Sequence, residues 1–187
     1  MDRFSIGIDP GFGETAAVLY RDADENAVLA YATYTAPDLK DPPAARAMAL
    51  ADRVIDTLAF WMDQFDIKLL DIGIETPVMA KNVDGFSKQW RFVQELESGI
   101  MHRLSGELIE CWVTEVNPST SKSLATNDGR ASKEEMVASS PFRDSQFRDS
   151  TKEALADAWA HGLATWETKG SRFNYSAAKA ATTRQIV

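Results

Sequence analysis

The stretch Phe4-Ser5-Ile6-Gly7-Ile8-Asp9-Pro10-Gly11 decides the fold of this chain. Its apolar residues alternate with small or polar ones, which is typical of a β-strand that places one face on a core. The closing Asp-Pro-Gly indicates a tight turn. The strand therefore ends on a carboxylate, Asp9, and a carboxylate next to a buried strand normally needs a cation or a metal ion as partner.

The segments that follow predict a mixed α/β sheet. Residues 15–20 and 27–35 read as strands that form a meander with the first one, because polar turn residues separate them. Residues 69–75 and 108–116 read as two further strands. Helical patterns lie between and after them, at residues 44–65, 87–104, 119–125, 132–138 and 151–166. This order predicts an α/β fold with a five-stranded mixed sheet flanked by helices.

A second carboxylate ends a strand at Glu75, in Ile72-Gly73-Ile74-Glu75. If the strands at residues 4–9 and 69–75 are neighbours, Asp9 and Glu75 meet at the carboxyl edge of the sheet. Glu153 and Asp157 lie four residues apart on one face of the last helix, among alanines that allow close packing. His161 continues that face, and we interpret it as a packing residue or as one that positions a ligand.

These residues predict a polar cavity that contains Asp9, Glu75, Asp157 and Glu153. Carboxylate ligands suit Mg²⁺, with Mn²⁺ as a substitute. Two such ions, ~4 Å apart, would activate a water and stabilise the leaving oxygen of a phosphodiester. Each residue also has an explanation without a metal ion. Asp9 could belong to a common Asp-Pro-Gly turn, and Glu75 could be a strand-end carboxylate whose hydrogen bonds are satisfied. Asp157 and Glu153 could lie on a solvated helix face.

Composition limits the possible partners. The net charge is −8, which by itself argues against nucleic acid, since phosphate-binding surfaces are usually basic. The charge is uneven, however, because residues 168–187 contain four basic residues and no acidic ones. We therefore predict one folded domain at residues 1–168, the part that contains the candidate metal ligands, and a basic tail at residues 169–187. The single cysteine, Cys111, is expected to be a buried strand thiol. No signal peptide or membrane span is recognised, so we expect a cytoplasmic protein.

Four segments, in this order, resemble the RuvC-type Holliday junction resolvases. They are Ile6-Gly-Ile-Asp-Pro-Gly11; Ile72-Gly-Ile-Glu75 with Met79-Ala-Lys-Asn82; Pro118-Ser-Thr-Ser-Lys122 with Gly129-Arg-Ala-Ser-Lys133; and residues 153–160. The resemblance extends to about residue 165.

The resemblance implies an RNase H-like fold and a magnesium-dependent endonuclease that cuts branched DNA, such as Holliday junctions. It implies Asp9, Glu75 and Asp157 as metal ligands. It implies Lys122 and Lys133 beside the scissile phosphate, where a cation stabilises developing charge. It also implies a homodimer that makes paired nicks.

The chain departs from the family at several positions. The family carries an acidic or histidine ligand where this chain has Ala154, so either Glu153, one residue earlier, substitutes for it or the fourth ligand is absent. It often places an aromatic residue after the second carboxylate, where this chain has Thr76-Pro77-Val78; Phe86 or Trp90 could replace it. With the acidic composition, these differences suggest a divergent member, of a kind that a bacteriophage could encode and that acts in a bacterium or in a phage-infected host cell. The candidate DNA contacts on the next helix are Lys81, Lys88 and Arg91, for which a solvated helix face is the alternative.

Three other functions remain open at this point. An ATP-using enzyme of the actin and sugar-kinase type also opens with a strand that ends in Asp-x-Gly, but needs two such domains. A ribonuclease acting on RNA–DNA hybrids or structured RNA would use the same carboxylates, although the paired lysines argue against it. A branched-DNA-binding protein without catalysis would not need three carboxylates.

Overall fold

The computed structural model describes residues 2–11, 13–21, 28–35, 40–77, 83–104, 110–167 and 172–174. Lys81, and most of the predicted tail at residues 169–187, lie outside the described residues. Predictions for these segments therefore stay predictions.

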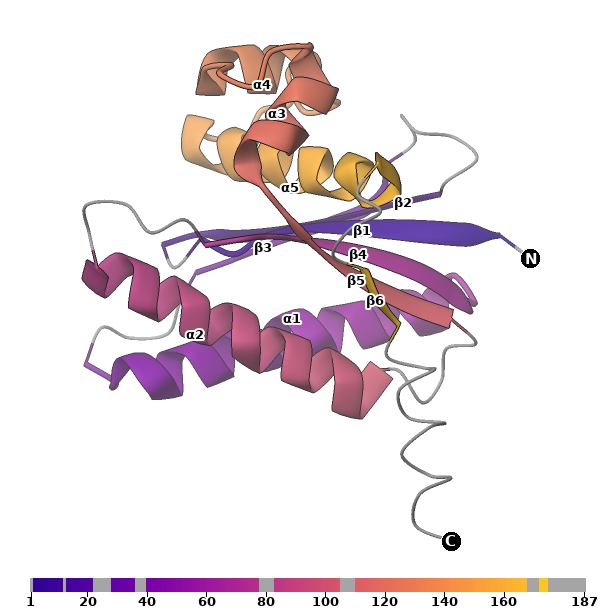
Figure 1. The fold of residues 1–187 in the computed structure, drawn as a ribbon, viewed down its shortest axis with the longest axis vertical. Coiled ribbons are helices and arrows are strands. Elements are labelled where there is room, and N and C mark those ends of the chain that lie inside the picture. The colour runs from indigo at the N-terminus through magenta and orange to yellow at the C-terminus, as the bar shows by residue number, and fades with distance from the viewer. Residues whose placement is uncertain are drawn as a thin grey trace, which may run out of the picture.

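The strands form one mixed sheet. They are β1 (Arg3–Asp9), β2 (Thr15–Arg21), β3 (Val28–Tyr34), β4 (Leu69–Glu75), β5 (Glu110–Val116) and β6 (Arg172–Asn174). The sheet order is β3-β2-β1-β4-β5-β6 (Figure 1). β2 is antiparallel to β1 and β3, whereas β4 is parallel to β1 and β5. The predicted five-stranded mixed sheet is confirmed, and β6 adds a short antiparallel strand beside β5.

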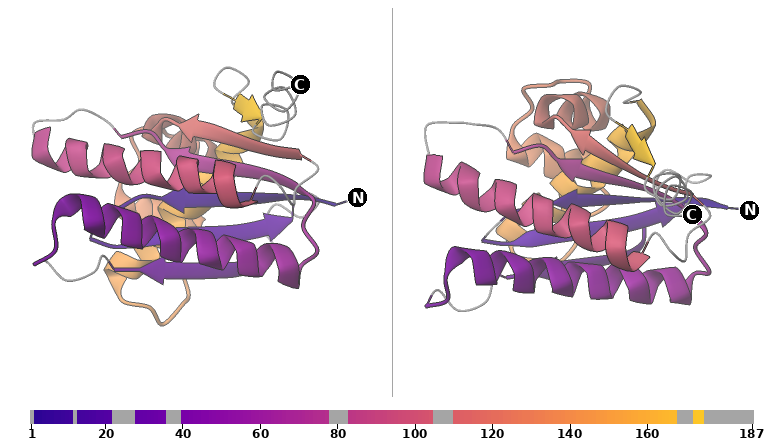
Figure 2. Two further views of the ribbon diagram at one scale, coloured as in Figure 1. Left: turned by 90° about the horizontal axis from the view of Figure 1, so that it is seen from below. Right: turned by 60° about the horizontal axis from the view of Figure 1, so that its bottom comes forward.

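Helices cover both faces of the sheet. They are α1 (Pro43–Gln64), α2 (Val83–Gly99), the π-helix η1 (Ile100–Leu104), α3 (Pro118–Thr126), α4 (Lys133–Ser139) and α5 (Asp149–Glu167). Figures 1 and 2 show α1 and α2 on one face and α5 on the other, with α3 and α4 packed on the outer side of α5. Each face of the sheet therefore has its own hydrophobic core.

The alternation in β1 and β4 decides which side chains face α5. Ile6 and Ile8 of β1, like Ile74 of β4, are buried in the core beneath α1 and α2. Successive side chains of a strand point to opposite faces of the sheet. Asp9 and Glu75, each next to one of these isoleucines, therefore emerge on the face that α5 covers.

The second helix begins at Val83, four residues earlier than the predicted Ser87. Asp84 lies in its first turn, where a negative charge interacts favourably with the helix dipole. The hydroxyl of Ser87 donates to the carbonyl oxygen of Val83 within the first turns of the helix. Gly85 weakens the helical signal in the sequence, which explains the late predicted start.

Glu97 of α2 offers a pH-dependent test of the packing between α2 and the sheet. Burial, helped by the nearby charge of Glu115, raises the pKa of Glu97 to about 7. A raised carboxyl pKa means that its contribution to stability is lost as the pH rises from its unfolded value towards 7. We expect Glu97→Gln to be more stable than the wild type above pH 7 by about 1 kcal/mol, after allowance for solvent screening.

The measurement for Glu97 is urea unfolding of both proteins between pH 4 and pH 8, in EDTA. The difference in free energy of unfolding should grow with pH and level off above the raised pKa. A difference that does not change with pH would contradict the assignment.

Cys111 is buried in β5, as predicted, and burial raises the pKa of its thiol to about 12. A thiol with such a pKa is inert as a nucleophile at neutral pH. Within the described ranges, no helix combines the length and the apolar composition that a membrane crossing requires.

Candidate metal centre

Asp9 and Glu75 lie side by side at the carboxyl ends of two parallel strands. The register pairs Ile8 of β1 with Ile74 of β4, so the residues that follow them are neighbours. Burial raises the pKa of Asp9 well above its usual range, and the nearby carboxylates of Glu75 and Asp157 raise it further. Like charges this close oppose each other's ionisation, and a bound cation would relieve that repulsion.

Two glycines bring α5 against the sheet at this point. A Cβ atom at Gly7 would lie 1.7 Å from the carbonyl oxygen of Ala158, and one at Gly73 would lie 2.3 Å from that of His161. Only hydrogen at these positions allows the helix backbone to lie directly on β1 and β4. Asp157 is thereby placed above the strand ends, and burial raises its pKa although the nearby His161 opposes that rise.

His161 lies among the strand-end carboxylates. One ligand atom from each of Asp9, Glu75 and His161 lies within 4.8 Å of the other two, and we call these residues the Asp9–Glu75–His161 group. The Nε2 atom of His161 is 3.4 Å from Oε2 of Glu75. Sequence reasoning treated this histidine as a packing or positioning residue. The sequence did place His161 one helical turn after Asp157, but a histidine that only packs against the sheet could occupy the same position.

Lys122 on α3 and Lys133 on α4 both lie close enough to Asp157 to lower its pKa, against the effect of burial. The Nζ atom of Lys122 donates to the carbonyl oxygen of Ala131 at 2.9 Å, which holds the lysine between α3 and α4. Lys133 is the first residue of α4, directly after the N-cap Ser132 and its capping box. Two lysines from different helices therefore lie near Asp157.

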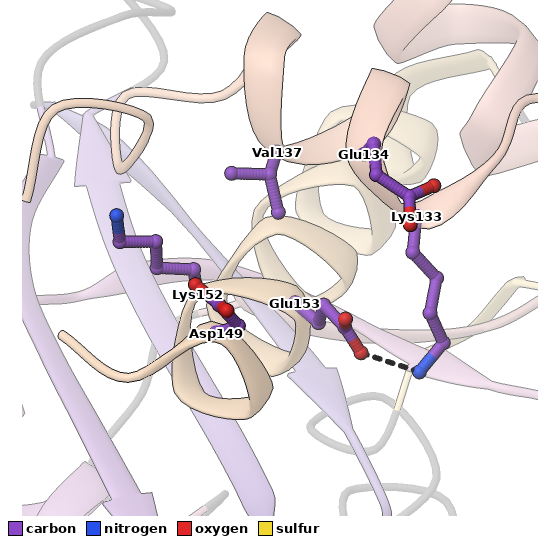
Figure 3. A pocket seen from close by; sticks show the side chains of 6 residues that line it. All are labelled: Lys133, Glu134, Val137, Asp149, Lys152 and Glu153. Carbon is purple, nitrogen blue, oxygen red and sulfur yellow. Dashed lines mark hydrogen bonds and ion pairs between the residues drawn. The ribbon is translucent and has the colours of Figure 1, made fainter.

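Glu153 is held by Lys133. The Nζ atom of Lys133 donates to Oε2 of Glu153 at 2.6 Å (Figure 3), and this hydrogen bond raises the pKa of the lysine. Neither Glu153 nor Asp157 belongs to the Asp9–Glu75–His161 group. The ion pair borders a hollow of about 270 Å³, which Figure 3 shows between α4 and the start of α5, lined by Lys133, Glu134, Val137, Asp149, Lys152 and Glu153.

A larger hollow of about 480 Å³ opens in front of the carboxylates. It brings Asp9 and Asp157 together with two cations, Lys133 and Arg148. Sequence reasoning did not single out Arg148. The position where the family would place a further ligand, Ala154, also lines this hollow, whose other residues are Gly13, Glu14, Thr35, Ser150 and Glu153.

Glu14 joins the turn after β1 to the first turn of α5. Its Oε1 accepts from the hydroxyl of Thr151 at 2.6 Å, and its Oε2 accepts from Ser150 at 3.1 Å and from Arg148 at 3.2 Å. Burial alone would raise the pKa of Glu14, but these hydrogen bonds lower it below its usual value. An ionised Glu14 therefore stabilises the wall of the larger hollow and orients Arg148.

The predicted DNA contacts on α2 lie around another hollow, of about 400 Å³, with Lys88 and Arg91 in its lining. The rings of Phe86 and Trp90 stack beside them with centroids 6.1 Å apart. Lys88 forms an ion pair with Asp84 at 2.5 Å, whereas Arg91 is exposed. Aromatic rings beside a cation can take an unpaired base.

The donor set of the centre suits a divalent cation. Asp9 and Glu75 can offer hard oxygen ligands, and Asp157 lies near enough to raise the pKa of Asp9. The imidazole of His161 is buried without a hydrogen-bond partner among the described residues. Burial is the main cause of the raised pKa of Asp9 and of Asp157, and a bound cation would favour the ionised form of both carboxyls. The residues therefore fit the metal ion that the sequence predicted.

Comparison of the sequence with protein-family models and with curated proteins finds no match. Comparison of the structure with solved structures does find matches. The structure of Thermus thermophilus RuvC matches with a TM-score of 0.64 and 15% identity, covering 91% of this chain and 99% of that one. T. thermophilus RuvC in complex with a Holliday junction substrate matches with a TM-score of 0.64 and 16% identity, covering 92% and 99%. This chain therefore has the RNase H-like fold of RuvC.

Proposed function

We propose that this chain is a metal-dependent endonuclease that hydrolyses phosphodiesters in branched DNA, such as four-way junctions. The observation that carries the proposal is the convergence of Asp9, Glu75 and Asp157 at one edge of the sheet, from two strands and a helix. The shared fold supports it, since T. thermophilus RuvC, which has this fold, is known in complex with a Holliday junction substrate.

The proposal assigns a chemical role to each group of residues. Asp9, Glu75 and Asp157 would hold Mg²⁺ or Mn²⁺, which supplies positive charge against the phosphodiester and promotes the loss of a proton from water. Lys133 and Arg148 line the same hollow as two of these carboxylates and can bind the non-bridging phosphate oxygens. These cations, together with bound metal, would offset the acidic composition of the chain at the place where DNA binds.

The ion pair between Lys133 and Glu153 supports a role for Glu153 in positioning Lys133. It holds the Lys133 ammonium on the side of the hollow where Asp157 lies. Lys122 of α3, whose ammonium donates a hydrogen bond to the carbonyl oxygen of Ala131, can add a second positive charge near Asp157. This arrangement of lysines supports the junction-cutting proposal over a ribonuclease that would use carboxylates alone.

A cleavage panel tests the proposal. The substrates are four-way junctions, three-way junctions, flaps, linear duplexes and RNA–DNA hybrids, each with Mg²⁺ and with EDTA. We expect Mg²⁺-dependent cutting of the branched DNAs, with nicks in symmetric pairs across a four-way junction because we propose a homodimer. Cutting of the hybrid alone would assign the chain to the ribonucleases. Binding to junctions without cutting in Mg²⁺ would make it a DNA-binding protein without catalysis.

A further inference from the structure

His161 is the most enclosed polar side chain at the centre. It is 2% exposed, and neither of its ring nitrogens has a hydrogen-bond partner among the described residues. Its Nε2 faces Glu75 at 3.4 Å, which is long for a hydrogen bond. Buried polar groups without partners are rare in proteins, so an imidazole in this state calls for an explanation.

We propose that His161 is a nitrogen ligand, through Nε2, of the cation held by Asp9 and Glu75, and that it makes the centre favour Mn²⁺ over Mg²⁺. The proposal rests on the metal centre of the proposed function. A cation among the ligand atoms of the Asp9–Glu75–His161 group, all within 4.8 Å of one another, would satisfy the imidazole and both carboxylates together.

The position of His161 is determined by the backbone of α5. Its carbonyl oxygen lies against Gly73 of β4, so the start of its side chain cannot move far from the strand end that carries Glu75. Asp157 lies one helical turn earlier on the same face. The helix would therefore present its nitrogen ligand one turn after Asp157, whereas the resemblance placed a further ligand at Ala154, one turn before it.

The donor type decides the metal preference. Mg²⁺ demands oxygen ligands and gives up its water reluctantly. Imidazole suits transition metals better, and Mn²⁺ accepts oxygen and nitrogen together. Replacing one oxygen ligand by the imidazole of His161 thus costs Mg²⁺ more affinity than it costs Mn²⁺.

Pulsed electron paramagnetic resonance of bound Mn²⁺ tests the ligand directly, because a coordinated imidazole nitrogen modulates the electron spin echo. The full chain is loaded with less than one equivalent of Mn²⁺, once unlabelled and once with ¹⁵N-histidine. We expect ¹⁴N modulation in the first sample and its replacement by ¹⁵N modulation in the second. This comparison needs no variant and therefore does not depend on whether a variant folds.

The chain contains two histidines, which provides a matched control. His102 is exposed in η1. His161→Gln should lose the nitrogen modulation, and His102→Gln should keep it. Calorimetric titration of His161→Gln should show Mn²⁺ affinity lowered at least tenfold, on the order of the effect of losing a supporting contact at a metal site, and Mg²⁺ affinity lowered less.

The outcomes separate this inference from the proposed function. Bound Mn²⁺ without nitrogen modulation, in a protein that cuts junctions, would overturn the inference alone. Nitrogen modulation that depends on His161, in a protein that cuts no nucleic acid, would support the ligand and overturn the nuclease. A wild type that binds neither metal ion would overturn both.

Discussion

Asp9→Asn is expected to reduce Mg²⁺-dependent junction cleavage to about one-thousandth or less, the scale of losing a main electrostatic contribution to catalysis. Asp9 lies between the strand end of Glu75 and the helix that carries Asp157. The amide keeps the shape of the side chain but removes the charge that would bind the cation. The measurement is a single-turnover cleavage rate on a labelled four-way junction.

The same variant should be folded and should still bind the junction. Asp9 has a raised pKa in the folded protein, so its ionised form destabilises the metal-free protein at neutral pH. Asp9→Asn should therefore unfold at higher urea concentration than the wild type in EDTA, and it should gain less stability from added Mg²⁺. Undiminished cleavage by the pure variant would contradict the metal centre. A loss of cleavage with lower stability in EDTA would contradict the charge argument.

Gly7→Ala should destabilise the fold by about 3 kcal/mol or more, at the upper end of the usual cost of overpacking. The added Cβ would lie 1.7 Å from the carbonyl oxygen of Ala158 and 2.5 Å from the backbone nitrogen of Gly162. Both atoms belong to the backbone of α5, so no side chain can rotate to relieve the clash. The helix must move away from β1, and Asp157 must move with it.

Urea unfolding measures this effect, and Gly13→Ala is the matched control. A Cβ at Gly13 meets nothing within 4 Å, and Gly13 does not require a positive φ. Its substitution should change the free energy of unfolding by no more than about 0.5 kcal/mol. A Gly7→Ala protein as stable as the Gly13→Ala protein would show that α5 does not lie directly on β1.

Much of the fold could be predicted because its signals are local. The alternation in Ile6-Gly7-Ile8-Asp9 predicts the strand and the carboxylate that ends it. The same pattern at residues 69–75 predicts the strand that ends at Glu75, and parallel pairing of this strand with the first one brings Asp9 beside Glu75. The early start of α2 at Val83 could not be predicted in the same way, because Gly85 weakens the helical pattern there.

The sequence by itself determined the mixed sheet and the strand ends that carry Asp9 and Glu75. Alternation along a strand depends only on neighbours in the chain, and so does the spacing that puts Asp157 and His161 on one helix face. Only the tertiary structure decided which partner each side chain meets. His161 lies among the carboxylates, Glu153 turns to Lys133, and Glu14 holds Arg148. These outcomes depend on how closely α5 approaches Gly7 and Gly73, a distance between elements that local patterns do not contain.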